Sequence, residues 1–126
     1  MYDKMNSMES QRELTEDPGG QLCPRFQRAT ELVGKRWTGA IIRVLIPAPC
    51  RFNELLARVT GISDRLLSER LRELETEGIV KRDVSPGPPV RVSYALTCSG
   101  HELEPVMSAL EAWAQKWITP ESLDRV

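Results

Sequence analysis

Arginine dominates the side chains of this sequence that could do chemistry. Between residues 23 and 100, thirteen basic residues outnumber eight acidic ones, so this part carries a net charge of +5, whereas the whole chain of 126 residues carries −1. Eleven of the thirteen are arginines, whose planar guanidinium groups form paired hydrogen bonds with phosphates and base edges. The segments 1–22 and 101–126 each hold two basic and five acidic residues. The middle of the chain is therefore where a polyanion is expected to bind.

Three cysteines supply the nucleophilic chemistry of the sequence. Cys23, Cys50 and Cys98 each fall near the start of a predicted helix, a position that favours the reactive thiolate. Cys23 borders the acidic segment and is expected to be the exposed one, whereas Cys50 and Cys98 are expected to be small buried side chains. An odd number of cysteines indicates a reducing compartment or a free functional thiol. With His101 they could form a Cys3His metal site, but the spacings of 27 and 48 residues and the lack of a CxxC pair argue against it, and no metal is expected.

Signatures of enzymes are missing from the sequence. It has no GxGxxG, GxSxG, Walker A or HExxH motif, and its single histidine has no evident triad partners. No apolar run reaches the length of a membrane span, and the acidic start of the chain lacks the apolar centre of a signal peptide. These features predict a soluble, cytoplasmic, single-domain protein that is not an enzyme, needs no cofactor and does not bind a membrane.

Hydrophobic residues recur at helical spacing in four segments of the first eighty residues. The segment 1–22 shows no such period and is expected to form a mobile acidic tail. The last two helical segments are joined by Thr60-Gly61, and Ser63 stands where the second of them needs an N-terminal cap. This pattern predicts a helix-turn-helix. The four helices are expected at about 24–33, 37–46, 52–59 and 63–77.

The hydrophobic period changes from helical to alternating after Gly78. The segments 79–84 and 90–96 have the pattern of two paired strands. Their connection, Ser85-Pro86-Gly87-Pro88-Pro89, cannot continue a strand ladder and is expected to project as a loop. A helix-turn-helix followed by such a hairpin is a winged helix.

A final helix is predicted after Thr97, with a kink or late start at Pro105 and an end at Pro120. Large apolar side chains follow this helix at nearly heptad spacing, which makes a face broad enough to pack against a second copy. The residues expected at this contact are Phe26, Leu110, Trp113 and Trp117. The predicted fold class is mainly α with a small β-hairpin, a winged helix-turn-helix with flanking dimerisation helices. The domain is expected to cover 23–118, followed by a C-terminal tail at 119–126.

The second helix of the predicted helix-turn-helix has two chemically different faces. Leucines form one face, and Arg65, Ser68 and Arg72 lie on the other. Such a helix enters the major groove of DNA, where arginine can bind guanine and serine can bind a base or a phosphate. A solvated face is the alternative because glutamates also decorate this helix, but the turn before it and the hairpin after it favour DNA reading. The remaining DNA contacts are expected from Ser63 at the cap, Arg51 near a helix start, and Arg82 and Arg91 on the wing.

Nine short motifs stand in order along the chain. They are Cys23-Pro24, Gly34-Lys35-Arg36-Trp37, Arg51-Phe52-Asn53-Glu54-Leu55, Gly61-Ile62-Ser63, Leu67-Ser68-Glu69-Arg70-Leu71-Arg72-Glu73-Leu74-Glu75, Gly78-Ile79-Val80, Pro88-Pro89-Val90, Tyr94-Ala95-Leu96-Thr97 and Gly100. In this order and over about residues 23–118, they resemble the sequence motifs of the HxlR-type, MarR-like transcriptional regulators. The ordered combination carries the resemblance rather than any one motif.

The resemblance implies a bacterial winged-helix repressor or activator that binds DNA as a homodimer. It also implies that the cysteine before the first helix, Cys23 here, senses electrophiles or oxidants, as it does in some members, where a modified or intermolecularly bridged thiol reshapes the dimer. The chain departs from the family pattern at two positions. Ser93 replaces an acid before the tyrosine, and Cys98 replaces a polar residue, which offers Cys23 an alternative partner.

The sequence therefore predicts a homodimeric transcriptional regulator that binds double-stranded DNA at a palindromic operator and responds to an oxidant or electrophile through Cys23. One alternative keeps the DNA-binding module but places control in a small molecule, bound in the dimer cleft near Trp37 and Trp113. Another alternative is a winged-helix module that binds other proteins.

Overall fold

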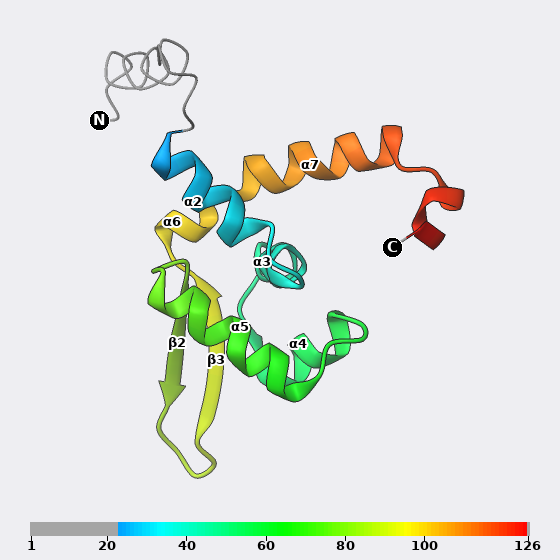
Figure 1. Cartoon of the computed structure of the whole chain (residues 1–126). Helices are drawn as coiled ribbons and strands as arrows, with labels where there is room; N and C mark the ends of the chain where they lie inside the picture. The colour runs from blue at the N-terminus through cyan, green and yellow to red at the C-terminus, as the bar shows by residue number, and fades with distance from the viewer. Residues whose placement is uncertain (1–22, 126) are drawn as a thin grey trace. The chain divides into compact units, whose positions relative to one another are not determined.

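The structure, a computed structural model, describes residues 23–125 (Figure 1). The acidic segment 1–22, expected to be mobile, lies outside the described residues. The chain divides into two compact units, one ending at Lys35 and the other beginning at Arg36. In the first unit, helix α2 (Pro24–Val33) begins after Cys23 and has a proline in its first turn, where the missing N–H leaves no hydrogen bond unmade.

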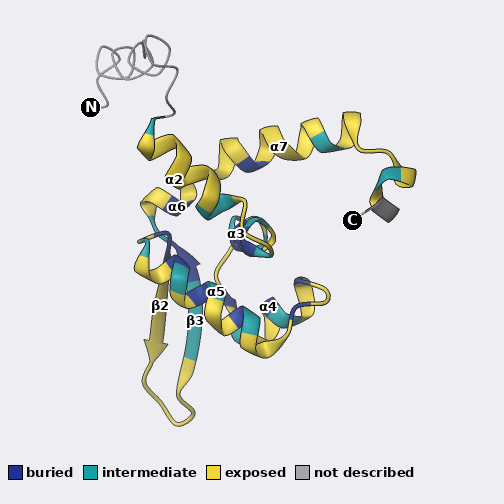
Figure 2. Cartoon of the chain, in the orientation of Figure 1, coloured by how far each residue is buried: buried dark blue, intermediate teal, exposed yellow. Residues whose placement is uncertain are grey.

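Three helices and a small sheet form the core of the second unit. Helices α3 (Thr38–Leu45), α4 (Phe52–Arg58) and α5 (Asp64–Thr76) follow one another, with strand β1 (Cys50–Arg51) before α4. Their buried residues are mostly apolar, and Figure 2 shows the buried segments of these elements in dark blue. The side chains with at most 1% of their surface exposed are Ile41, Ile42 and Leu45 of α3, Leu55 of α4, and Leu67, Leu71 and Leu74 of α5.

The hairpin that follows α5 extends beyond the helices (Figure 1). Strands β2 (Val80–Ser85) and β3 (Arg91–Leu96) pair antiparallel, with Val80 opposite Leu96 at the buried end. The sheet has the order β1-β3-β2, so β1 adds a third strand that the sequence did not predict. Its two residues are too few to show an alternating pattern. Helix, strand, two helices and a hairpin in this order make a winged helix-turn-helix.

The last part of the chain agrees with its prediction at Pro105 and differs from it at Pro120. The expected late start is confirmed, because a short helix α6 (Cys98–His101) precedes helix α7 (Glu104–Trp117), whose first turn contains Pro105. Helix α7 ends before Pro120, however, and Pro120 begins a 3-10 helix, η1 (Pro120–Arg125), where a plain tail was expected. Proline fits the first position of a helix because its φ is already close to helical values.

Candidate nucleic-acid interface

The turn between α4 and α5 fixes where the second helix begins. Gly61 has a φ of +96°, a conformation that disfavours side chains other than hydrogen. A Cβ atom at this position would lie 3.3 Å from Cη2 of Trp37, so the turn also packs against that ring. The backbone amide of Leu66 donates a hydrogen bond to the Ser63 hydroxyl oxygen at 3.1 Å, which confirms Ser63 as the cap of α5.

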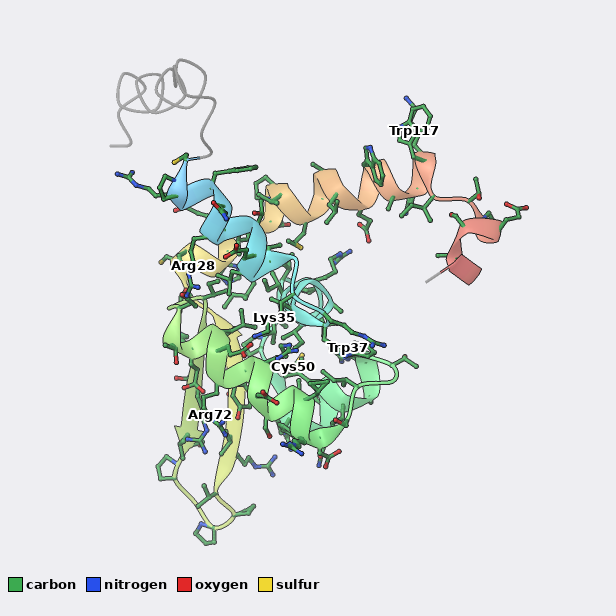
Figure 3. All side chains as sticks on the ribbon, in the orientation of Figure 1. Arg28, Lys35, Trp37, Cys50, Arg72 and Trp117 are labelled. Carbon is green, nitrogen blue, oxygen red and sulfur yellow. The ribbon has the colours of Figure 1, made fainter. Side chains whose placement is uncertain are left out.

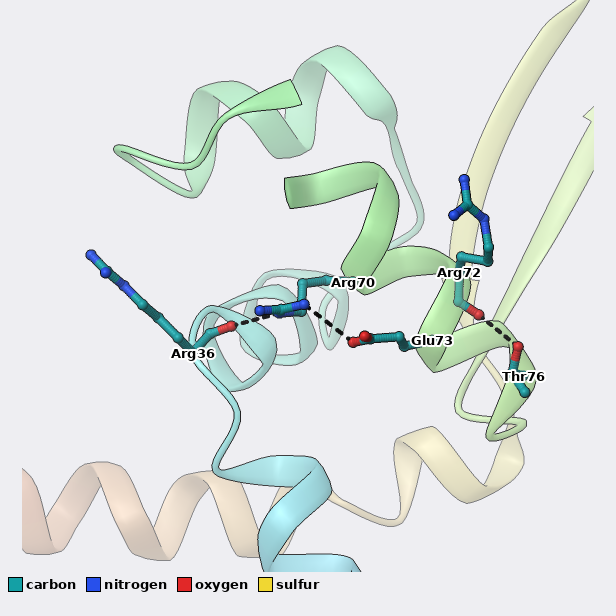
Figure 4. Close-up of polar contacts among 5 residues, drawn as sticks. All are labelled: Arg36, Arg70, Arg72, Glu73 and Thr76. Atoms are coloured by element: carbon teal, nitrogen blue, oxygen red, sulfur yellow. Dashed lines mark hydrogen bonds and ion pairs between the residues drawn. The ribbon is translucent and has the colours of Figure 1, made fainter. Parts of the chain in front are cut away.

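The solvent face of α5 carries the side chains that the sequence singled out. Arg65, Ser68 and Arg72 are all exposed, while leucines of the same helix are buried beneath them. No ion-pair partner is present for Arg65 or Arg72 within the described part of the chain. Figure 4 shows the Arg72 side chain pointing away from the neighbouring ion pair of α5, while its backbone carbonyl accepts a hydrogen bond from the Thr76 hydroxyl at 2.9 Å. The guanidinium groups on this face are thus available to an outside partner.

Arg70 has a different role from the other arginines of α5. Its Nη1 lies 3.4 Å from Oε1 of Glu73, three positions further along the same helix. Its Nε also donates to the backbone carbonyl of Arg36 at 2.9 Å (Figure 4). This second bond ties α5 to the segment before α3, and the sequence could not indicate it because the two residues are 34 positions apart. Arg70 therefore positions α5 and is not available to a partner.

The segment bound by Arg70 has a strained backbone. Trp37, labelled in Figure 3, has a φ of +76°, and among the described residues it is the only one other than glycine with a positive φ. The guanidinium carbon of Arg36 lies 4.9 Å from the centre of the Trp37 ring. With Gly61 against the same ring, this tryptophan holds the entry to α3 and the turn before α5 together.

The wing arginines are separated by the strand register. Residues directly opposite in an antiparallel pair have their side chains on the same face, and successive residues alternate between faces. Arg82 is opposite Tyr94, whereas Arg91 is opposite Ser85. Tyr94 and Arg91 are three positions apart on β3, so Arg82 and Arg91 lie on opposite faces of the hairpin.

Arg51 shares the face of Arg91. It pairs with Ser93 in the sheet, and Ser93 is two positions from Arg91 on the same strand. An open groove of about 360 Å³ lies between the two arginines. Its lining residues are Arg51, Phe52, Asn53, Pro89, Val90, Arg91 and Val92.

The three cysteines occupy different environments. Cys23 directly precedes α2 and is partly exposed. Cys50, labelled in Figure 3, is 2% exposed, with Nη1 of Arg58 at 3.4 Å from its sulfur. Burial raises the pKa of the Cys50 thiol and outweighs the nearby Arg58 charge, so the expectation of a small buried side chain is confirmed for this residue. Cys98, expected to be buried, is exposed because it begins α6 at the surface.

The residues expected at a dimer contact are exposed in both units, Phe26 on α2 and the other three on α7. Phe26, Leu110, Trp113 and Trp117 are each between 53% and 62% exposed, and Figure 2 shows most of α7 in yellow. Only Met107 of α7 is buried. Among the described residues, no group of histidine, cysteine and acidic side chains could hold a metal ion, and no helix is long and apolar enough to cross a membrane.

These features define the class of protein. A capped helix with exposed, unpaired arginines follows a glycine turn and precedes a basic hairpin, which is the arrangement of a winged helix-turn-helix DNA-binding protein. The model of the HxlR-like helix-turn-helix family matches residues 32–122. The chain belongs to the HxlR-like helix-turn-helix family and is a transcriptional regulator.

Relatives of known name agree with this assignment. The chain is 46% identical over 104 residues to YvaP of Bacillus subtilis (strain 168), an uncharacterised HTH-type transcriptional regulator, and the match covers 82% of this chain and 96% of YvaP. The reduced form of the transcriptional regulator YodB from B. subtilis has a TM-score of 0.71 and 44% identity, covering 79% of this chain and 98% of YodB. YodB structures also exist in diamide-treated and quinone-bound forms. The redox regulator HypR in its reduced form has a TM-score of 0.69 and 34% identity, covering 73% of this chain and 91% of HypR.

Proposed function

We propose that this regulator binds a palindromic operator in double-stranded DNA as a homodimer, with α5 of each copy in the major groove. The exposed, unpaired arginines of α5 carry this proposal, because the leucines on the opposite face fix the helix and leave the guanidinium groups to a partner. Arg65, Ser68 and Arg72 contact base edges. The Ser63 hydroxyl uses its oxygen in the cap and still has its hydrogen to donate to a phosphate.

The wing and the apolar helices complete the assembly. Arg82 and Arg91 anchor the wing on the DNA backbone, one from each face, and Arg51 binds phosphate beside them. The exposed apolar residues Phe26, Leu110, Trp113 and Trp117 are covered by the second copy, because patches of this kind are rarely left in contact with water. The functional domain is 23–118, and the protein acts on the chromosome in the bacterial cytoplasm.

Control of DNA binding is assigned to Cys23. YodB has been solved in diamide-treated and quinone-bound forms, and HypR in reduced and oxidised forms, which supports control through a thiol here. Covalent modification of the partly exposed Cys23 thiol changes the angle between the two reading helices of the dimer and lowers its affinity for the operator. An oxidant or an electrophile such as a quinone is the expected effector.

Fluorescence anisotropy with the duplex upstream of the protein's own gene tests DNA reading. Arg65→Ala is expected to cost about 1–3 kcal/mol on this duplex and to relax base specificity, whereas its effect on a scrambled duplex is small. Arg43→Ala is the matched control, because it also removes one exposed arginine but lies on α3, where Arg43 pairs with Glu111 of α7. Equal losses for the two variants on both duplexes would mean that α5 does not read bases.

The same assay tests the thiol. Diamide is expected to weaken operator binding of the wild-type protein and to leave Cys23→Ser unchanged. Cys98→Ser serves as the control, because Cys98 is also exposed but begins α6 and does not border α2. A full diamide response in Cys23→Ser would refute the assignment of the sensor while leaving the DNA-binding function in place.

A further inference from the structure

The groove between β1 and the wing has an arginine on each of its two sides. Its walls are Arg51, Phe52 and Asn53 on one side, and residues 89–92, which include Arg91, on the other. Each wall thus supplies one guanidinium group, and both side chains project from the same face of the sheet. Two cationic groups with apolar surface between them match the alternation of phosphate and deoxyribose along a DNA strand.

Neither guanidinium group is neutralised within the described chain. Glu54 is the nearest acid in sequence to Arg51, but its Oε1 accepts a hydrogen bond at 2.7 Å from the Arg51 backbone amide. This bond and the pairing with Ser93 hold the Arg51 backbone in place and leave the guanidinium group unpaired. Arg91 likewise has no ion-pair partner among the residues that the structure describes.

One carboxylate shares this face of the sheet. Asp83 lies across Ser93 from Arg51, on the far strand β2. Two strand spacings separate the backbones of Asp83 and Arg51, about 10 Å, at which salt largely screens exposed charges. Asp83 is not part of the groove lining and forms no ion pair with Arg91 within the described residues. The net charge that faces the groove is therefore positive.

We propose that Arg51 and Arg91 bind the same phosphate of one DNA strand, as the two sides of a clamp, with the adjoining sugar against Phe52. This inference rests on the proposed DNA-binding function. The groove is open rather than enclosed, which suits a strand that continues past it on both sides more than a small free anion. Arg82 projects from the opposite face of the hairpin and binds the DNA independently of the clamp.

Salt titrations distinguish a shared phosphate from two separate ones. The logarithm of the binding constant falls with the logarithm of the salt concentration by about 0.9 for each phosphate neutralised. The double variant Arg51→Ala/Arg91→Ala is expected to reduce this slope by about 0.9. The double variant Arg82→Ala/Arg91→Ala, which removes the same charge, is expected to reduce it by about 1.8 because two phosphates are lost.

Affinities on one duplex give a second measure. Arg51→Ala and Arg91→Ala are each expected to weaken binding by about tenfold. Their combination is expected to weaken it by little more, because either substitution alone already loses the contact with the shared phosphate. Combining Arg82→Ala with Arg91→Ala is expected to multiply the two losses. The folded state of each variant is checked by its far-UV circular dichroism spectrum and thermal unfolding.

A methylphosphonate scan identifies the phosphate directly. Replacing backbone phosphates one at a time by neutral methylphosphonates should reveal one position that weakens the wild-type protein but has no further effect on Arg51→Ala or on Arg91→Ala. The clamp would be overturned if Arg51→Ala and Arg91→Ala became insensitive to methylphosphonates at different positions. It would also be overturned if the losses of affinity multiplied in Arg51→Ala/Arg91→Ala. Neither result would affect DNA reading by Arg65. Absence of any duplex binding by the wild-type protein would overturn both the clamp and the proposed function.

Discussion

Replacing Gly61 by alanine tests the turn that positions the reading helix. At a φ of +96° an L-residue is strained by roughly 1–2 kcal/mol. The added Cβ would also lie 3.3 Å from Cη2 of Trp37, so the ring must shift by a few tenths of an ångström. This overpacking adds about 1 kcal/mol to the cost of the substitution, the lower end of the usual range. Alanine also lowers the conformational entropy of the unfolded chain, which stabilises the folded state by about 0.4–1 kcal/mol. The free energy of unfolding is thus expected to fall by about 1–2.6 kcal/mol.

Gly78→Ala provides the matched comparison. Gly78 follows α5 with a φ of +76°, and nothing lies within 4 Å of a Cβ built there. Only the backbone strain and the lower entropy of the unfolded chain then affect stability, so the free energy of unfolding should fall by about 1 kcal/mol or less. The larger loss for Gly61→Ala then reports the contact with Trp37, and it should shrink in a Trp37→Leu background, where the ring atom is gone.

Urea unfolding followed by far-UV circular dichroism measures both variants, at one fixed protein concentration because the proposed dimerisation would add to the apparent stability. Operator affinity is measured in parallel, since a displaced turn also moves the start of α5. Equal losses of stability for Gly61→Ala and Gly78→Ala would show that the contact with Trp37 adds no cost. A larger loss for Gly61→Ala that persists in the Trp37→Leu background would show that the ring is not its cause.

Four further outcomes are expected. Ser63→Ala removes the cap of α5 and should lower the free energy of unfolding by about 1 kcal/mol, measured by urea unfolding with Ser68→Ala as a control that leaves the cap intact. Because burial raises the pKa of Cys50, the native state holds that proton more tightly than the unfolded state. Stability should fall as the pH rises above the ordinary thiol pKa of about 8.5, and a stability–pH curve unchanged by Cys50→Ala above that pH would contradict this. In alkylation followed by mass spectrometry, Cys98 should react in the native protein and Cys50 only on unfolding, because their exposures differ. Arg43→Ala breaks an ion pair that is half exposed on both sides, so the loss of stability should stay below about 0.5 kcal/mol; a loss above 1 kcal/mol would show that this pair is more than a surface contact.

Local signals made much of the fold predictable. The leucine spacing and the Ser63 cap define α5 within the sequence itself, and Gly61 and Gly78 mark its two flanking turns. The change to an alternating period after Gly78 likewise identifies the wing. The exposed residues of the reading helix follow directly from the buried ones, because a helix that buries three leucines on one face must present the other face to solvent.

Features that depend on tertiary pairing could not be predicted in the same way. Strand β1 has two residues and exists because β3 offers it a partner. The bond from Arg70 to the Arg36 carbonyl joins distant segments. The separation of Arg82 and Arg91 onto opposite faces depends on the register of the hairpin, which the five-residue connection alone does not determine. The exposure of Cys98 follows from where α6 begins.

The sheet order has a consequence for the behaviour of the protein in concentrated solution. Strand β2 is an edge strand over its whole length, so one side of its backbone has hydrogen-bonding groups open to another strand. Charged side chains on such an edge discourage pairing between copies, and Lys81, Arg82 and Asp83 stand in its centre. The exposed Val84 beside them would favour that pairing once the charges are removed. Basic residues of the wing thus also protect the protein from aggregation through its edge, and a wing stripped of them should self-associate as its concentration rises.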